Sequence, residues 1–558
     1  PGSKDYNPKS YTAKMMAKGG QMQNFAGYDA TRLAHSDQKM ECQSCHTSWI
    51  TNCFGCHLPQ QANWKKSMNH FEGSTSRNWT SYNPQVIRDD GFMLGLTGRT
   101  KGNKITTVRS SSALMLSSRN ANREQVYSQQ PPISAPGYSS QAFNPHFAHT
   151  VRKAETRACS DCHVSANNDN NAWMAQTLLH GTNFVNFIGR YAYVAQGKSG
   201  FEAVEVTEVD EPQAVIGSYL HKLAYPDDYK QHFSNGRNLK TAYHHGGDDV
   251  RSVQLRGEYL YTANGPGGFR VYDVASIDNK GISERIITAP VSPLGQDTHV
   301  KTKFATAVAL PTNMPIDTRR RSVIEDPKNE EQPFHPLYSY AYITDKFEGL
   351  IVVDVMNLAD GDPRNNFLER TVTFNPSGVL NGASNLAIAG EYVYVLCDAG
   401  LVVVSIDNPR KPKLVAAVRA PELKKPRAIA IQFRYAFVVD AEGVKVLDIT
   451  DLEKPRLVED SMVPLRGAND IYVARTYAYV AAGKKGLVII DVEKPDSIFV
   501  DQVFAAKGKI DDARGVKVGS TNASLFAYLA DGKNGLRVIQ LTSPLSPGHL
   551  GFSPKPMP

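Results

Sequence analysis

The sequence lacks several features that often identify a protein. No stretch of about eighteen apolar residues occurs, so we expect no transmembrane segment. The chain opens Pro1-Gly2-Ser3-Lys4-Asp5 without the apolar run of a signal peptide. Residues 187–558 contain no recognisable catalytic triad, glycine-rich phosphate loop or metalloprotease motif. Cysteine is also scarce, with seven among 558 residues. A chain of this length suggests two to four domains.

Six of these seven cysteines fall in three Cys-x-x-Cys-His motifs. This pattern is the attachment signature of c-type haem, because two thiols three residues apart can add to the two vinyl groups on one edge of the haem. The adjacent histidine then reaches the iron. We therefore predict three covalently bound haem c groups. The motifs are Cys42, Cys45 and His46; Cys53, Cys56 and His57; and Cys159, Cys162 and His163.

Zinc binding and a redox dithiol are alternatives for paired cysteines. Neither requires a histidine directly after the second cysteine in every copy. The seventh cysteine, Cys397, follows a predicted buried strand and has no second cysteine or base beside it in the sequence, so we expect it to pack as a small apolar side chain.

The second axial ligand of each iron decides its chemistry. The three motif histidines are the predicted proximal ligands, and a second histidine would make the iron six-coordinate and suited to electron transfer. An open position would permit chemistry on a small molecule. By their distance along the chain from the motifs, the candidate distal ligands are His35, His70 and His149, with His146 and His180 in reserve; Met15, Met16, Met22, Met40 and Met68 could serve instead.

Positive charge is concentrated in the N-terminal third. Residues 1–186 carry 19 Lys and Arg against 11 Asp and Glu, while the rest of the chain carries 43 against 44. A nucleic-acid surface is one interpretation. We favour another, since each haem brings two propionates that residues such as Arg152, Lys153 and Arg157 could neutralise. No nucleic-acid partner is therefore expected.

Residues 1–186 show little sustained periodicity and few aliphatic runs, so they would fold weakly alone. Buried haem would supply the missing apolar surface. We predict a multihaem cytochrome domain with short helices near the motifs and irregular connections, the longest between His70 and His146.

From residue 187 onward the sequence repeats. Seven segments pair an aromatic strand such as Tyr392–Val395 with a glycine-led aliphatic strand such as Gly400–Val404. The glycines stand at 200, 268, 349, 400, 443, 486 and 535, and a basic unit of 43 residues separates three of them in succession. Such a unit is typical of a four-stranded propeller blade with a tight hairpin at the glycine. A solenoid is the competing architecture.

The runs Gly349–Asp354 and Gly486–Asp491 resemble the LVIVD repeat family. The resemblance covers about residues 187–545 and implies a β-propeller, but it says little about chemistry. We therefore predict a mainly β chain, with a seven-bladed propeller over residues 187–558. The spacing predicts long insertions in the first two blades, one holding His221, His232, His244 and His245, the other His299 and His335. We expect at least one to pack against the haem segment.

These features favour an extracytoplasmic electron-transfer protein, periplasmic or at the cell surface, because c-type haem is attached outside the bacterial cytoplasm. A signal is expected to have been removed before residue 1. The partners would be other redox proteins or further copies of this chain in a conductive assembly. The alternatives are an oxidoreductase acting on a small nitrogen or sulfur compound at an open haem, and a propeller binding module tethered to a respiratory chain.

Overall fold

The computed structural model describes residues 187–542 with gaps, residues 554–557, and several short stretches between residues 35 and 145. The chain divides into two compact units, and the strands from β8 onward all belong to one of them. No helix in these described parts is long and apolar enough to cross a bilayer.

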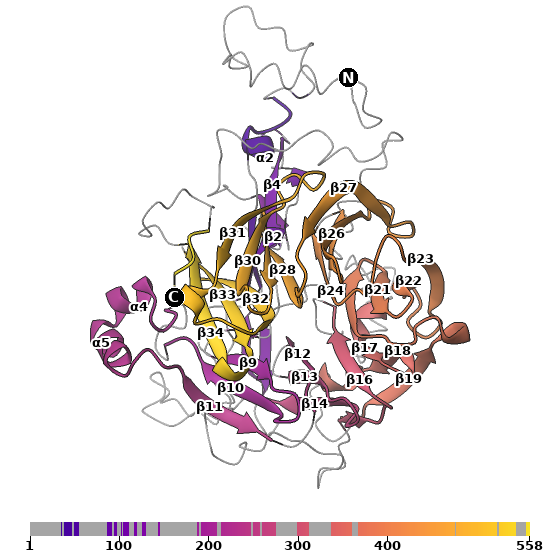
Figure 1. The fold of residues 1–558 in the computed structure, drawn as a ribbon, viewed down its shortest axis with the longest axis horizontal. Helices are drawn as coiled ribbons and strands as arrows, with labels where there is room; N and C mark the ends of the chain where they lie inside the picture. The colour runs from indigo at the N-terminus through magenta and orange to yellow at the C-terminus, as the bar shows by residue number, and fades with distance from the viewer. Residues whose placement is uncertain are drawn as a thin grey trace, which may run out of the picture. The chain divides into compact units, whose positions relative to one another are not determined.

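Seven antiparallel sheets form the blades of a β-propeller (Figure 1). The first four blades are β8–β11 (Phe187–Ile188, Tyr191–Ala195, Phe201–Glu205, Lys240–His245), β12–β15 (Ser252–Arg256, Tyr259–Ala263, Phe269–Asp273, His299–Val300), β16–β19 (Ala305–Ala309, Tyr340–Asp345, Gly349–Asp354, Glu369–Phe374) and β20–β23 (Asn385–Ala389, Tyr392–Cys397, Gly400–Ser405, Lys413–Val418). The last three are β24–β27 (Ala428–Gln432, Tyr435–Val439, Gly443–Asp448, Arg456–Pro464), β28–β31 (Asp470–Ala474, Tyr477–Ala481, Leu487–Asp491, Phe499–Phe504) and β32–β34 (Ala513–Thr521, Ser524–Asp531, Leu536–Thr542).

Short helices lie between some of these strands. Two α-helices connect β10 to β11, and single 3-10 turns occur elsewhere. They are α4 (Tyr219–Ala224), α5 (Pro226–Ser234), η5 (Pro336–Ser339), η6 (Met356–Ala359), η8 (Pro376–Gly378), η9 (Ala506–Gly508) and η10 (Gly532–Asn534).

The middle strands of the second to sixth blades are largely buried on both faces, as their continuous apolar sequence predicts. All six residues of β17 are buried, and so are the first five of β18 and of β22. The fourth strands β19, β23 and β31 are much more exposed. This gradient follows from the architecture, because the inner strands are covered by the neighbouring blades and the fourth strand forms the rim.

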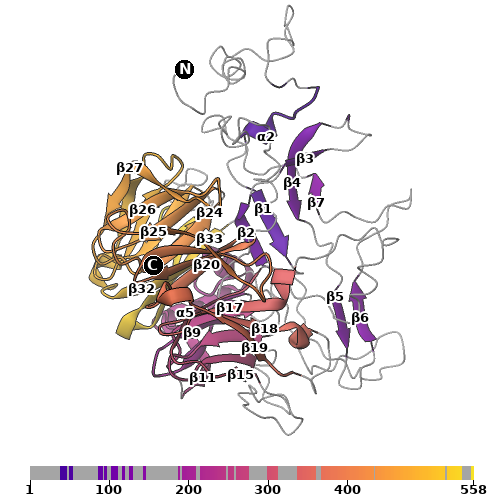
Figure 2. The same ribbon diagram turned by 90° about the vertical axis from the view of Figure 1, so that its right-hand side faces the viewer.

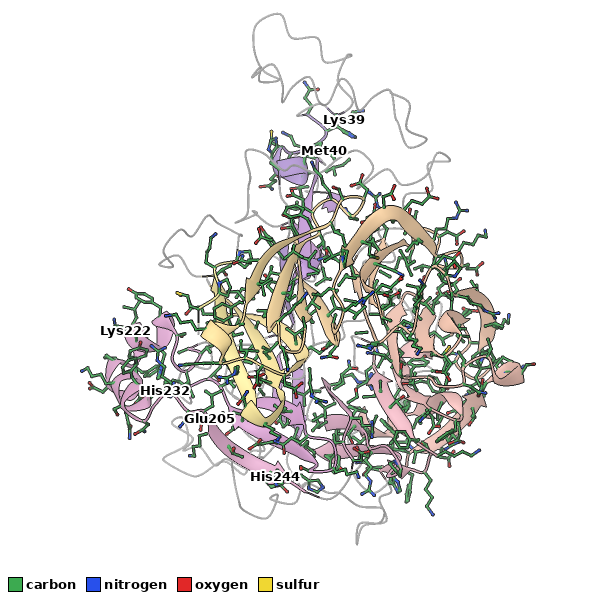
Figure 3. The ribbon with its side chains drawn as sticks, in the orientation of Figure 1. Lys39, Met40, Glu205, Lys222, His232 and His244 are labelled. Atoms are coloured by element: carbon green, nitrogen blue, oxygen red, sulfur yellow. The ribbon has the colours of Figure 1, made fainter. Side chains whose placement is uncertain are left out.

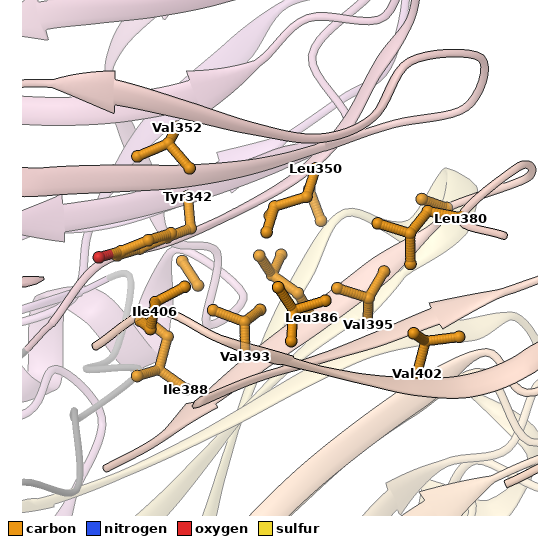
Figure 4. Close-up of a cluster of buried hydrophobic side chains, with 14 of the residues drawn as sticks. Tyr342, Leu350, Val352, Leu380, Leu386, Ile388, Val393, Val395, Val402 and Ile406 are labelled. Carbon is orange, nitrogen blue, oxygen red and sulfur yellow. The ribbon is translucent and has the colours of Figure 1, made fainter. Parts of the chain in front are cut away.

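A cluster of buried apolar side chains fills each boundary between neighbouring blades. Between the third and fourth blades, Tyr342 and Val352 face Leu386, Val393 and Val402 (Figure 4). Equivalent clusters lie at the other five boundaries along the chain. At about 25 cal/mol for each Å² of apolar surface buried, these clusters are the main source of stability.

A seventh cluster joins the last blade to the first. It brings Phe526 and Tyr528 of β33 against Ala192 of β9 and Val204 of β10. The yellow strands therefore lie beside the magenta strands in Figures 1 and 2. The ring is closed, and the competing solenoid interpretation is wrong, because a solenoid leaves its terminal repeats unpaired. Each blade uses consecutive strands, so side-chain packing closes the ring without an exchange of strands.

The glycine before each third strand is required by close backbone approach as well as by the turn. In blades one to six, a Cβ atom at this glycine would overlap a backbone carbonyl of the fourth strand; at Gly486 it would lie 2.5 Å from the Phe504 oxygen. Gly443 lacks a positive φ angle, so at this position the close approach of the backbone by itself requires glycine. Gly535 has no such neighbour, since β34 is the last of only three strands in its sheet.

Residues near the C-terminus take part in the last blade. The Met557 N–H donates to the Gln540 carbonyl at 2.9 Å, and the Gln540 N–H donates back to the Met557 carbonyl at 3.1 Å. The segment therefore pairs with β34 where the other blades carry a fourth strand.

The described N-terminal stretches contain one helical turn and short strands. They are α2 (Gln43–His46), β1 (Ile50–Phe54), β2 (Val86–Gly91), β3 (Leu94–Leu96), β4 (Ile105–Ser110), β5 (Leu116–Arg119), β6 (Gln125–Gln129) and β7 (Phe143–Pro145). β1 pairs with β2, β4 lies between β3 and β7, and β5 pairs with β6. These strands occupy part of the region where irregular connections were predicted, and β1 includes Cys53 of the second motif, where a short helix was predicted.

Candidate functional site

The first haem motif folds as a single helical turn. The N–H groups of Cys45 and His46 both donate to the Cys42 carbonyl at 3.1 Å. Residues three and four positions apart lie on the same side of a helix. The backbone therefore places the two thiols on one face, with the histidine next to them.

The two residues between the cysteines hold this turn on strand β4. The hydroxyl of Ser44, which is buried, donates to the Ile105 carbonyl at 3.1 Å, and the Gln43 amide donates to the Thr106 hydroxyl at 3.0 Å. The backbone N–H of Glu41, just before the motif, also donates to the Ile105 carbonyl, at 2.9 Å. The variable positions of the motif thus face β4.

Glu41 completes a small polar network. One oxygen of its carboxylate accepts from the Gln43 amide and from the Thr106 hydroxyl, both at 2.7 Å. Because Thr106 also accepts from Gln43, the three side chains form a closed triangle that restricts the rotamers of all three.

The residues of the turn fit covalent haem attachment. Cys42 is exposed, Cys45 and His46 are half-buried, and neither cysteine forms a disulfide. Two reduced thiols on one accessible face, followed by an imidazole, are what thioether formation and axial ligation require. Within the described residues, no group of three or more His, Cys, Asp or Glu side chains has the geometry of a metal site.

Two of the other predicted haem residues lie within the described part of the chain. The backbone of Cys53 lies in β1, and half-buried His35 precedes the first motif. The remaining candidates lie outside the described residues, and their roles stay predictions: Cys56, His57, Cys159, Cys162, His163, His70, His146, His149 and His180.

The prediction of histidine-rich insertions is only partly right. His221 and His232 do lie on the helical insertion of the first blade, where Lys222 and His232 are labelled in Figure 3. His244 and His245, however, belong to β11, and His299 belongs to β15. The extra length precedes β11 and β15 and, in the third blade, β17; sequence spacing could not locate these positions. His335 lies outside the described residues.

The described histidines of these two blades make local structural contacts. In the first blade the His244 Nε2 lies 2.9 Å from the Ser199 carbonyl, and in the second the His299 Nε2 lies 2.9 Å from the Gly267 carbonyl. Both contacts tie a fourth strand to the hairpin of its own blade. On the insertion, buried His221 accepts the Gly217 N–H at Nδ1, and its Nε2 lies 2.6 Å from Glu208.

Aspartates that recur in the blades stabilise turns. After the second strand, buried Asp440 accepts the N–H groups of Glu442 and Gly443. After the third strand, Asp448 accepts the Thr450 N–H at 2.8 Å, and Asp354 and Asp491 make the equivalent bond two residues on. These are Asx-turns, so the aspartate that ends the repeat motif has a structural role.

Cys397 also packs as the sequence indicated. It is buried, its thiol donates to the Val379 carbonyl at 3.5 Å, and burial raises the pKa of the thiol above its usual value. A protonated thiol of this kind is a poor nucleophile.

Comparison with known proteins identifies the repeat. Six segments match the LVIVD repeat, at residues 247–279, 339–360, 382–419, 425–463, 466–499 and 513–551. They fall in the second to seventh blades. No curated protein sequence matches the chain.

Solved structures add little to this assignment. A functionally unknown protein from Desulfotomaculum acetoxidans is 14% identical with a TM-score of 0.33, covering 56% of this chain and 90% of its own. The computationally designed Ika8 protein is 9% identical with a TM-score of 0.36, covering 64% and 96%. The extracellular domain of the putative hybrid two component system BT3049 from B. thetaiotaomicron is 10% identical with a TM-score of 0.38, covering 65% and 41%. At these scores, none of the three structures supports a conclusion about this chain. The chain contains LVIVD repeats, and they fold as blades of a seven-bladed β-propeller.

Proposed function

We propose that this protein is an extracytoplasmic multihaem c-type cytochrome that transfers electrons, with the propeller as its scaffold or docking module. The helical turn at Cys42, Cys45 and His46 carries the proposal, since it aligns both thiols and the imidazole on one face. Three copies of the motif in one chain support it further.

Each part of the first site has a distinct role in this proposal. Cys42 and Cys45 hold one haem through thioether bonds, and His46 is its proximal ligand. Ser44 and the triangle of Glu41, Gln43 and Thr106 keep the turn in the conformation that attachment needs. The bound haem supplies an iron that gains and loses one electron.

The other two motifs would bind haem in the same way, which gives three haem c groups in total. Histidine as the second ligand on each iron would close it to substrates. The protein would then pass electrons to other redox proteins or to further copies of itself, in the periplasm or at the cell surface.

The test is a haem count on the purified protein. Mass spectrometry should find three added haem groups, and acid–acetone should extract none of the pigment. The double variant Cys42→Ser/Cys45→Ser should retain two haems, whereas the matched control Cys397→Ser should retain three. A protein without added haem mass, or with pigment that acid–acetone extracts, would contradict the proposal.

A binding role for the propeller is the second candidate. Its recurrent aspartates are used in turns, and the connections at one edge of the ring are short and rich in cations.

A further inference from the structure

Antiparallel pairing brings two kinds of connection to the same edge of every blade. In the fourth blade, Asn385, at the start of the first strand, pairs with Leu396 near the end of the second. Leu396 pairs with Leu401 near the start of the third, which pairs with Val418 at the end of the fourth. The hairpin between second and third strands and the connection to the next blade therefore lie at one edge, called the hairpin face here.

The hairpin face carries only short connections. Its described residues are 196–200, 246, 249–251, 264–268, 301–304, 346–348, 375–384, 398–399, 419–427, 440–442, 465–469, 482–486, 505–512 and 532–535. The helices α4 and α5 and the long connections between β14 and β15 and between β16 and β17 all leave from the opposite edge. The only helices among the described residues of this face are the single 3-10 turns η8, η9 and η10.

Exposed positive charge dominates this face. Fifteen exposed lysines and arginines lie on its described residues, with three exposed carboxylates, Asp398, Glu422 and Asp511. The cations are Lys198, Arg251, Lys301, Lys303, Lys346, Arg419, Lys424, Lys425, Arg427, Arg466, Lys484, Lys485, Lys507, Lys509 and Lys533.

The opposite edge is nearly balanced. Its described connections and the strand residues beside them expose ten cations, Lys222, Lys230, Arg237, Lys240, Arg410, Lys411, Lys413, Lys454, Arg456 and Lys494, and seven carboxylates, Asp227, Asp228, Glu369, Asp407, Asp451, Glu453 and Asp496. Among the residues that the structure describes, the excess of positive charge therefore lies on the hairpin face.

Several half-buried carboxylates of the hairpin face are already paired. Glu348 lies 2.7 Å from Arg370, and Glu442 lies 2.7 Å from Lys424 and 2.6 Å from the buried Lys445. Glu442 thus offsets one of the fifteen cations, Lys424, and Asp249, 2.6 Å from Arg251, offsets another, which leaves thirteen against the three exposed carboxylates. Eleven of the fifteen exposed cations are lysines, whose compact and hydrated ammonium groups suit diffuse attraction more than bidentate recognition.

Every blade contributes at least one of these cations. The first blade has Lys198, the fifth has Arg466 and the seventh has Lys533. A protein partner of ordinary size covers only about 800 Å² on each side. Charge spread around the whole ring is a better match for an extended anionic surface.

An exposed aromatic side chain on the same face favours a bilayer as that surface. Phe347, at the hairpin of the third blade, is 55% exposed. The Lys346 ammonium lies 5.5 Å from its ring, and the ring of Phe304 lies 6.3 Å away. An aromatic ring flanked by lysine suits the boundary between headgroups and acyl chains. A soluble polyanion offers such a ring no apolar layer.

We infer that the hairpin face binds a bilayer surface rich in anionic lipid headgroups, with Phe347 at the interface. The attraction comes from the exposed lysines and weakens within a Debye length of the surface. The inference concerns the propeller and does not depend on haem.

The test is co-sedimentation of the full-length protein with vesicles. Vesicles of equal parts phosphatidylglycerol and phosphatidylcholine should bind it, and phosphatidylcholine alone should not. Raising NaCl from about 0.1 M to about 1 M shortens the Debye length from about 10 Å to about 3 Å and should release the protein. Protein is measured by total amount in the pellet, so the result is independent of the haem count.

Charge reversal provides the matched comparison. The variant Lys425→Glu/Lys484→Glu/Lys485→Glu/Lys509→Glu should weaken vesicle binding by at least about tenfold. The control Lys411→Glu/Lys413→Glu/Lys454→Glu/Lys494→Glu makes the same charge change at the opposite edge and should bind like the wild type. Phe347→Ala should weaken binding less than the first variant.

Three outcomes would overturn the inference. One is no binding to the anionic vesicles at about 0.1 M NaCl. Another is an equal loss in both charge-reversal variants, which would indicate attraction by net charge alone. The third is retention on dextran sulfate without vesicle binding, which would make the partner a soluble polyanion.

Discussion

The propeller and the haem-motif segment bury different kinds of side chain. Between blades, residues such as Tyr394, Val403 and Leu447 are fully buried in apolar clusters. Among the described side chains of residues 35–107, the buried ones are Ser44, Thr106 and Thr107, all polar. The propeller thus contains its own core, whereas the haem-motif segment is organised at its described site by hydrogen bonds. In the proposed cytochrome, haem would supply the apolar surface on which such a segment depends.

The largest expected effect tests this dependence directly. Protein made without covalent haem attachment should lose residues 1–186 to limited proteolysis, because that segment then lacks its apolar core. The propeller should remain as a resistant fragment, since its clusters need no cofactor. Gel electrophoresis and mass spectrometry would identify the fragments, with haem-loaded protein as the control. Equal protection of both regions in the haem-free protein would contradict the contrast.

The next effect compares the closing boundary of the ring with an internal one. Phe526 lies in the closing cluster, and Phe437 lies between the fifth and sixth blades; both are almost fully buried. Replacing either by Ala should lower the free energy of unfolding by about 3–5 kcal/mol. Urea unfolding followed by circular dichroism measures both. A near-zero effect at Phe526 alone would mean that the ring opens there in solution.

A smaller effect is expected at the repeat aspartates. Asp448→Ala removes the acceptor for the Thr450 N–H and should cost about 0.5–1.5 kcal/mol of unfolding free energy. Asp448→Asn keeps an oxygen acceptor and should cost less. The same urea titration compares the two variants. If Asn were as harmful as Ala, the charge rather than the Asx-turn would be the stabilising feature.

The smallest effect is a pH dependence within the propeller. Hydrogen bonds from Lys424 and Lys445 lower the pKa of Glu442 from 4.5 to about 2. Because this folded-state pKa is depressed, the stabilisation is present above pH 4.5 and is lost as the pH falls toward 2. Glu442→Gln should remove this part of the acid sensitivity. Urea midpoints at about pH 5 and about pH 3 would compare variant and wild type. The same midpoint shift in both would assign the sensitivity to other carboxylates.

Much of the propeller could be predicted from local patterns. The pairing of Tyr392–Val395 with Gly400–Val404, repeated seven times, predicted the blades, because strand periodicity and glycine hairpins are local properties. The reason for the glycines was only partly visible, since the clash at Gly486 involves Phe504 on another strand. The positions of His244 and His299 were missed because spacing alone cannot tell an insertion from the strand that follows it.

The candidate haem site was also only partly predictable from the sequence. The Cys-x-x-Cys-His spacing by itself marked Cys42, Cys45 and His46, because the haem edge dictates that spacing. Its support by Glu41, Ser44 and Thr106 was not predictable, since β4 lies some sixty residues further along the chain. Nothing in the sequence itself links the haem motif to strand β4.

The amino-acid sequence by itself determined the number of blades and the buried strands and marked the residues predicted to bind haem, because these patterns depend on neighbours within a few positions. Only the tertiary structure decided that Phe526 closes the ring against β9 and β10, that Met557 pairs with β34, and that lysines and arginines from seven blades share one face. These features join residues far apart in the chain. They are caused by strand pairing within the blades and by the packing of the blades into a closed ring, neither of which local spacing encodes.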